Sequence, residues 1–72
     1  MSMFRDYHVT TDGRNTHCVT IADAGEGHRY VSSNMFGHIW TKTAKTDEEA
    51  IGELMTKHGR KVKAVRPMNG GE

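Results

Sequence analysis

The sequence contains one cysteine, Cys18, and no apolar run near the roughly 18–20 residues that a membrane-spanning helix requires. A single cysteine excludes an internal disulfide, and the absence of a Cys-x-x-Cys pair removes the commonest zinc-binding motif. A secreted domain of 72 residues would normally carry several disulfides, and residues 1–6 contain no apolar stretch typical of a secretion signal. We therefore expect a soluble cytoplasmic protein with no membrane association.

Large aliphatic residues and phenylalanine are also scarce. Leu, Ile, Val and Phe together number eleven, which is below the level of about 20% at which disorder becomes a concern. The net charge is only +1, however, whereas disordered chains usually carry a high net charge. We expect one small domain over residues 1–72 with a disordered tail at about 68–72. Because its core is thin, a partner surface or a homodimer would add stability.

The clearest local pattern predicts a helix over residues 47–58. Thr46 and Glu49 form a capping box, in which the Thr46 hydroxyl accepts the Glu49 N–H and the Glu49 carboxylate reaches back to the Thr46 N–H. Acidic residues at 47–49 suit the positive end of the helix dipole, and Gly59 is a natural stop. One stripe of the helix faces a core, and it is formed by Ala50, Ile51, Leu54, Met55 and His58.

The residues around this helix have the alternation of β-strands. Strands are predicted over 4–11, 16–22, 28–33 and 38–44, although the last two could be one strand bent near Gly37. Residues 60–66 predict a further strand in which Val62 and Ala64 face inward. Its lysines would disfavour pairing with another strand, so we expect it at an edge of the sheet. The expected fold class is α+β: an antiparallel β-meander of three or four strands, one amphipathic helix packed on one face, and a C-terminal edge strand.

The residue types that most often perform chemistry occur without the spacing that chemistry needs. The nearest histidines are nine positions apart, whereas structural zinc sites use pairs three to five residues apart. Cys18 has no local motif of a catalytic nucleophile. Gly25 and Gly27 precede a strand pattern, while phosphate-binding glycine loops lead into a helix. We expect no enzyme activity, no metal and no cofactor.

Charge is distributed unevenly along the chain. Half of the ten basic residues fall within ten positions: Lys57, Arg60, Lys61, Lys63 and Arg66. The preceding helix carries the acidic residues Asp47, Glu48, Glu49 and Glu53. This pattern allows two kinds of partner, a protein that contacts the acidic surface or a nucleic acid that contacts the basic segment.

The segment from Thr43 to Ile51, followed by Leu54, resembles the sheet-to-helix junction of small β-β-β-α modules. These include HicB-like antitoxin domains and the arm-binding domains of phage integrases. The Pro-Gly segment that precedes the helix in HicB-type domains is missing, so no functional residue is transferred. As a whole, the short chain with a thin core, one cysteine and sided charge is similar to small accessory proteins of phages and mobile elements. Anti-CRISPR proteins and other inhibitors used in host takeover belong to this group.

This resemblance implies a non-enzymatic protein of the phage anti-defence, anti-CRISPR-like type, located in the host-cell cytoplasm if a phage encodes it. It would inhibit or modulate a larger host protein or nucleoprotein complex by occluding a surface. The expected protein-binding residues are Trp40, Tyr30, Tyr7, Asp47, Glu48, Glu49 and Glu53, because aromatic groups dominate binding hot spots and charge sets specificity. The alternative is a DNA- or RNA-binding module that uses Lys57, Arg60, Lys61, Lys63 and Arg66. The sequence pI of about 8.0 favours the first reading, since nucleic-acid-binding domains usually exceed about 9.

Overall fold

The computed structural model describes residues 4–13 and 15–68. In chain order the elements are β1 (Phe4–Thr11), β2 (Thr16–Asp23), β3 (Arg29–Ser33), β4 (Gly37–Thr41), α1 (Asp47–Lys57) and β5 (Val62–Pro67). The predicted α+β class, with a meander, one helix and a C-terminal edge strand, is confirmed. The open question of three or four strands before the helix is answered by four.

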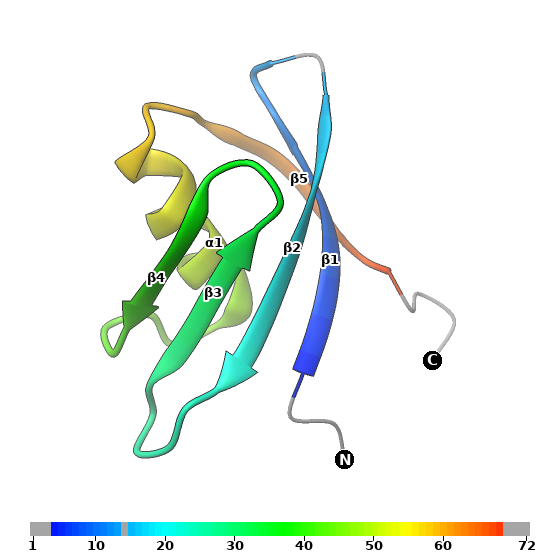
Figure 1. Ribbon diagram of the computed structural model, residues 1–72. Helices are drawn as coiled ribbons and strands as arrows, with labels where there is room; N and C mark the ends of the chain where they lie inside the picture. The colour runs from blue at the N-terminus through cyan, green and yellow to red at the C-terminus, as the bar shows by residue number, and fades with distance from the viewer. Residues whose placement is uncertain (1–3, 14, 69–72) are drawn as a thin grey trace.

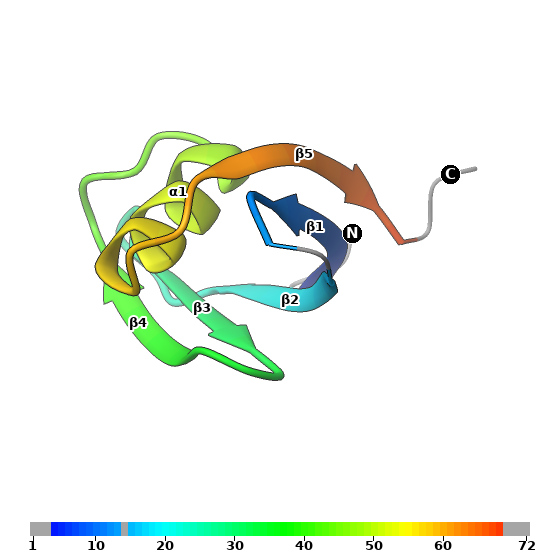
Figure 2. The same cartoon turned by 90° about the horizontal axis from the view of Figure 1, so that it is seen from above.

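The five strands form one antiparallel sheet in the order β4-β3-β2-β1-β5. Because every strand is antiparallel to its neighbours, β4 and β5 run in the same direction at opposite edges. Helix α1 connects these two edges across one face of the sheet. Figures 1 and 2 show the sheet curving around α1, while the opposite face of β2, β3 and β4 has no helix over it. We call this second face the open face.

The core lies between α1 and the covered face of the sheet. Strand alternation directs every second side chain toward the helix. The side chains that meet there have almost no exposed surface: Val9, Val19, Ile21 and Val31 from the sheet, and Ala44, Ala50, Ile51, Leu54 and Met55 from α1 and the segment before it. Complete burial of a Val, Leu, Ile or Met side chain contributes roughly 1.5–3 kcal/mol to the free energy of unfolding. The predicted helical stripe is confirmed except for His58, which is exposed at the C-cap.

The ends of α1 follow the sequence signals with one difference. The Thr46 hydroxyl accepts the Glu49 N–H at 3.1 Å, as the capping box predicts. The Glu49 carboxylate accepts from the Lys45 N–H at 2.9 Å, and the predicted partner, the N–H of Thr46, was wrong by one residue. At the other end Gly59 has a positive φ of 75°, which a glycine adopts without strain and which ends the helix.

The turn between β3 and β4 explains why the chain makes two strands here instead of one bent strand. Gly37 has a φ of 76°, a left-handed conformation that glycine adopts without steric cost. It closes a loop over residues 34–36, inside the cross-strand pair of Ser33 and Gly37. The Ser33 hydroxyl accepts the N–H groups of Met35 at 3.2 Å and Phe36 at 3.4 Å. A hairpin therefore replaces the alternative of a bulge.

Strand β5 pairs with β1 at the edge, as predicted, but its inward residues differ from the prediction. The register between β1 and β5 shifts between Thr10 and Thr11, so that Thr10 faces Ala64 and Thr11 faces Val62. Such an irregularity places one extra residue in β5 and changes the phase of the alternation. Val62 and Val65 pack against the core, whereas Ala64, predicted to face inward, is exposed.

The end of the described chain is attached to the sheet. Met68 belongs to the predicted tail, and its N–H donates to the Asp6 carbonyl at 2.9 Å. Residues 69–72 of that tail lie outside the described residues. No helix in the described part of the chain has the length and apolar character needed to cross a membrane.

Candidate functional site

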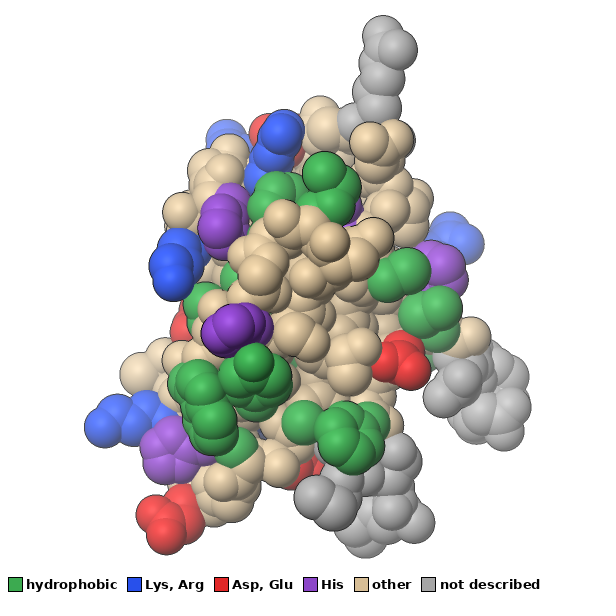
Figure 3. Space-filling model, viewed as in Figure 1, with side chains coloured by type: hydrophobic (Ala, Val, Ile, Leu, Met, Phe, Trp, Pro, Cys, Tyr) green, Lys and Arg blue, Asp and Glu red, His purple; other side chains and the backbone are tan. Residues whose placement is uncertain are grey.

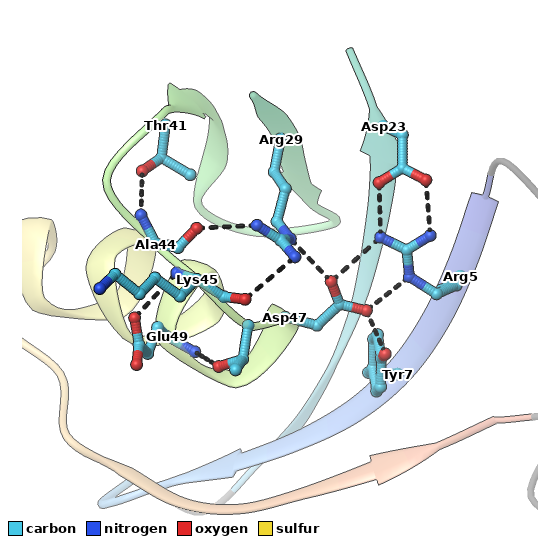
Figure 4. A network of polar contacts seen from close by, with 10 residues as sticks. Arg5, Tyr7, Asp23, Arg29, Thr41, Ala44, Lys45, Asp47 and Glu49 are labelled. Carbon is cyan, nitrogen blue, oxygen red and sulfur yellow. Dashed lines mark hydrogen bonds and ion pairs between the residues drawn. The ribbon is translucent and has the colours of Figure 1, made fainter. Parts of the chain in front are cut away.

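A network of charged side chains fixes the first turn of α1 to the sheet (Figure 4). Asp47 is the first residue of α1, and its carboxylate accepts hydrogen bonds from three side chains. Arg5 donates through Nε at 2.5 Å and Nη2 at 3.0 Å, Arg29 donates through Nε at 3.0 Å, and the Tyr7 hydroxyl also donates. Three donors from β1 and β3 thus converge on one carboxylate at the start of the helix.

The two arginines extend this network to other segments. Arg5 forms a second pair with Asp23 at the end of β2, at 2.9 Å and 3.1 Å. Arg29 donates to the carbonyl oxygens of Ala44 at 2.7 Å and Lys45 at 3.3 Å, in the segment before the helix. Each guanidinium therefore joins Asp47 to a second part of the chain.

The network changes the proton affinity of its members. Burial raises the pKa of Asp47, but the hydrogen bonds from Arg5, Tyr7 and Arg29 outweigh it and hold that pKa at about 2. The hydrogen bonds that Arg5 donates to Asp23 lower the pKa of the Asp23 carboxyl group. Burial, and then the bond to Asp47, raises the pKa of Tyr7. A carboxylate with a pKa of about 2 is a poor general base near neutral pH, so the network suits a structural role.

Two of the predicted protein-binding residues therefore point inward. Asp47 has a side chain only 15% exposed, and the Tyr7 hydroxyl is directed at it on the covered face of the sheet. Their interactions hold the helix in place and leave little surface for a partner. The predicted roles of Asp47 and Tyr7 in binding stay predictions, and the structure gives both residues a role in stability.

The open face carries a row of apolar side chains that crosses four strands. In the sheet register Trp40 of β4 faces Tyr30 of β3, Tyr30 faces Ala22 of β2, and Ala22 faces Phe4 of β1. We call Phe4, Ala22, Tyr30 and Trp40 the aromatic strip. Trp40 is 64% exposed and Phe4 is 60% exposed. In Figure 3 hydrophobic side chains gather at the lower end of this face, over β3, β4 and the start of β1.

Neighbouring rings hold the exposed indole in place. The rings of Tyr30 and Trp40 meet edge to face with centroids 5.1 Å apart, and the ring of His38, also on β4, lies 5.3 Å from that of Tyr30. Such contacts between aromatic rings contribute about 0.5–1.5 kcal/mol each. The strip is therefore a supported, partly pre-organised surface, and little side-chain entropy would be lost on binding.

Charges of both signs surround the aromatic strip. Asp6 lies two positions after Phe4 on β1 and faces the same side of the sheet. Glu26 lies in the turn between β2 and β3. Lys42 follows directly after β4. In Figure 3 basic side chains are scattered around the rim of this face instead of surrounding the hydrophobic group. This arrangement suits binding to a protein surface better than binding to a nucleic acid. A nucleic acid would need a positively charged groove around its stacked bases.

The remaining predicted site residues lie apart from the aromatic strip. Glu48, Glu49 and Glu53 are exposed on α1, and Glu53 accepts a hydrogen bond from the Thr43 hydroxyl at 2.9 Å. Glu49 and Glu53 also line a shallow hollow beside Gly52 on the outer surface of the helix. The basic residues run from the end of α1 along β5, and all five are exposed: Lys57, Arg60, Lys61, Lys63 and Arg66.

The sequence prediction missed two members of the aromatic strip, Phe4 and Ala22. Tyr30 and Trp40 were selected as aromatic residues, but their alignment with β1 and β2 depends on the register of three hairpins. Strand alternation points the side chain of Ala22 to the face opposite that of its neighbour, the buried Ile21. This was the sequence signal available for placing Ala22 on the open face. In the part of the chain that the structure describes, no three His, Cys, Asp or Glu side chains gather closely enough to hold a metal ion.

No protein-family model matches this chain, and neither the curated proteins nor the solved structures contain a match. Its function is therefore inferred from its own residues and their geometry.

Replacing Asp47 by Asn is expected to lower the free energy of unfolding by about 2 kcal/mol at pH 7, because two arginines lose their shared carboxylate. The pKa of Asp47 is about 2 in the folded state against an ordinary value of 3.8, so its contribution is present above about pH 4. That contribution is lost as the pH falls toward 2. Urea unfolding at several pH values measures both effects. Glu48→Gln, on the same turn but exposed, should change little, and an Asp47→Asn variant as stable as wild type would contradict the assignment.

Replacing Trp40 by Ser is expected to lower the free energy of unfolding by only about 0.5–1.5 kcal/mol, because the indole is mostly exposed and loses chiefly its contact with Tyr30. Leu54→Ala, inside the core, should cost about 2–5 kcal/mol. Since Trp40 is the only tryptophan, its fluorescence should also be quenched readily by acrylamide in the native protein. An emission maximum at the short wavelength typical of a buried tryptophan would be inconsistent with the exposed position. A Trp40→Ser protein that fails to fold would also be inconsistent with it.

Proposed function

We propose that this protein is a non-enzymatic binding module whose aromatic strip attaches to the surface of a larger protein. The single observation that carries this proposal is the exposed Trp40, supported by Tyr30 and His38 on a rigid sheet. Tryptophan and tyrosine are the residues most enriched in binding hot spots. Neither ring is needed to cover the core, which lies on the other face of the sheet.

The size of the strip suits a specific contact. A fully buried aromatic side chain removes about 150–250 Å² from solvent, and Trp40 and Phe4 still expose 64% and 60% of their surface, so the rings supply part of the ~800 Å² that each partner contributes to a standard interface. The exposed members of the surrounding face, among them His38, Asp6 and Lys42, would form its polar rim. The complementary partner has an apolar centre with basic groups placed toward Asp6 and Glu26.

Binding of this kind inhibits by occlusion and requires no chemical step. Together with the resemblance to phage accessory proteins, it leads us to propose a host protein or nucleoprotein complex as the target. Nucleoprotein machines expose basic grooves for nucleic acid, and the carboxylates of Asp6 and Glu26, on the same side of the sheet as the aromatic strip, would complement such a groove.

The experiment compares three immobilised proteins in capture from a lysate of the natural host: wild type, Trp40→Ala and Met35→Ala. Met35 is 61% exposed in the β3–β4 turn and lies outside the strip, so it is a matched control for loss of exposed apolar surface. The captured partner is then purified and its affinity measured. Trp40→Ala should weaken binding about 30-fold or more, corresponding to a hot spot of about 2 kcal/mol. Met35→Ala should change it less than about threefold. Equal binding by Trp40→Ala and wild type, or no stoichiometric partner, would refute the proposal.

A second candidate function, binding to DNA or RNA, is favoured by the basic segment over 57–66. All of its lysines and arginines are exposed, and the ion pairs formed within the described residues use only Arg5 and Arg29 as cations. Lys63 and Arg66 lie on the edge strand β5, and the other three cations lie at the end of α1 and in the connection before β5, so together they could follow a phosphate backbone.

This alternative predicts a retarded band in a gel shift at low salt, with an affinity that falls steeply as salt increases. The double variant Lys61→Glu and Lys63→Glu should abolish the band, whereas Lys42→Glu and Lys45→Glu, outside the segment, should preserve it. The absence of any retarded band for the wild-type protein would exclude this function.

A further inference from the structure

A second feature of the open face lies at the edge opposite Trp40. Strands β1, β2 and β5 surround a hollow of about 410 Å³ that is lined by His8, Thr10, Thr16, Ala64, Arg66 and Pro67. In Figure 3 a histidine and a basic side chain lie together at the right-hand edge of this face. Neither the aromatic strip nor the core uses these residues.

The sheet register brings complementary hydrogen-bond donors together in this hollow. His8 faces Arg66 across β1 and β5, and Thr10 faces Thr16 across β1 and β2. On the β5 side Thr10 faces Ala64, whose small side chain leaves room between the polar groups. A guanidinium, an imidazole and two hydroxyl groups therefore surround one space.

The charge of the hollow is positive. No carboxylate is among the described residues that line it. The closest acidic residue along β1 on the same face is Asp6, and its carboxylate accepts from the Thr20 hydroxyl at 2.7 Å, directed toward β2. The ion pairs of the described residues do not include Arg66, so its planar fork of donors is not held by a carboxylate.

We propose that this hollow is a binding site for a single oxyanion, a phosphate or carboxylate group. Arg66 makes a bidentate contact to two of its oxygens, because the guanidinium fork matches the spacing of oxygens in both groups. The Thr10 and Thr16 hydroxyls and the His8 ring donate to the remaining lone pairs. The site does not depend on the proposed function, since it shares no residue with the aromatic strip.

The test titrates the full-length protein with inorganic phosphate, sulfate and acetate, and follows backbone amide and histidine signals by NMR. Sodium chloride at matched ionic strength is the control for general screening. Phosphate and sulfate should produce saturable shifts confined to the residues that line the hollow. A stronger response to acetate than to phosphate would assign the site to carboxylates, and the reverse order would assign it to phosphates.

Three variants connect the binding to the proposed contacts. Arg66→Gln should weaken phosphate binding about tenfold or more, because it removes the charged fork. Arg66→Lys keeps the charge without the fork and should give an intermediate loss. Lys63→Gln removes another exposed cation from the same strand, outside the lining of the hollow, and should change the affinity less than about twofold.

Three results would overturn the proposal: shifts that spread evenly over the basic residues, shifts that never saturate, or equal binding by wild type and Arg66→Gln. The core amide signals of each variant report whether it remains folded. If Arg66→Gln does not fold, the comparison of Arg66→Lys with Lys63→Gln decides the question.

Discussion

The carboxylate of Asp47 is the point on which the arrangement of helix and sheet depends. It lies at the positive end of the α1 dipole and accepts donors from β1 and β3, while Arg5 continues the contact to the end of β2. Hydrophobic packing between α1 and the sheet is not directional, so it alone would allow the helix to slide or rotate. The charged network adds direction, and it fixes the first turn of the helix in one position.

With α1 fixed on one side, the two faces of the sheet have different roles. The covered face contains the aliphatic core, and Arg5, Tyr7 and Arg29 on the same face form the network. The open face carries the aromatic strip, which crosses β4, β3, β2 and β1. It also carries the hollow lined by hydrogen-bond donors near the β5 edge. The two proposed contact regions would therefore not weaken the core, because neither contributes a fully buried side chain.

Much of the fold could be predicted from the sequence because its signals are local. The capping box at Thr46, the stripe of Ile51 and Leu54, and the stop at Gly59 all lie within one short segment. The inward direction of Asp47 could not be predicted, since its partner Arg5 is 42 positions away and nothing local distinguishes Asp47 from Glu48. The phase of β5 was also missed, because the shift occurs in its pairing with β1 and leaves no mark in the sequence of β5. The aromatic strip was seen only in part for the same reason: register is a property of strand pairs.

The pairing of β1 with β5 joins opposite ends of the described chain, since Tyr7 faces Pro67. During synthesis β1 can form its hairpin with β2 early, but its other side stays unpaired until residues 62–67 have left the ribosome. Contacts so distant in sequence slow folding, because a long loop must close before they contribute. Until then β1 is an exposed edge able to pair with other chains, and among the five strands only β5 covers it.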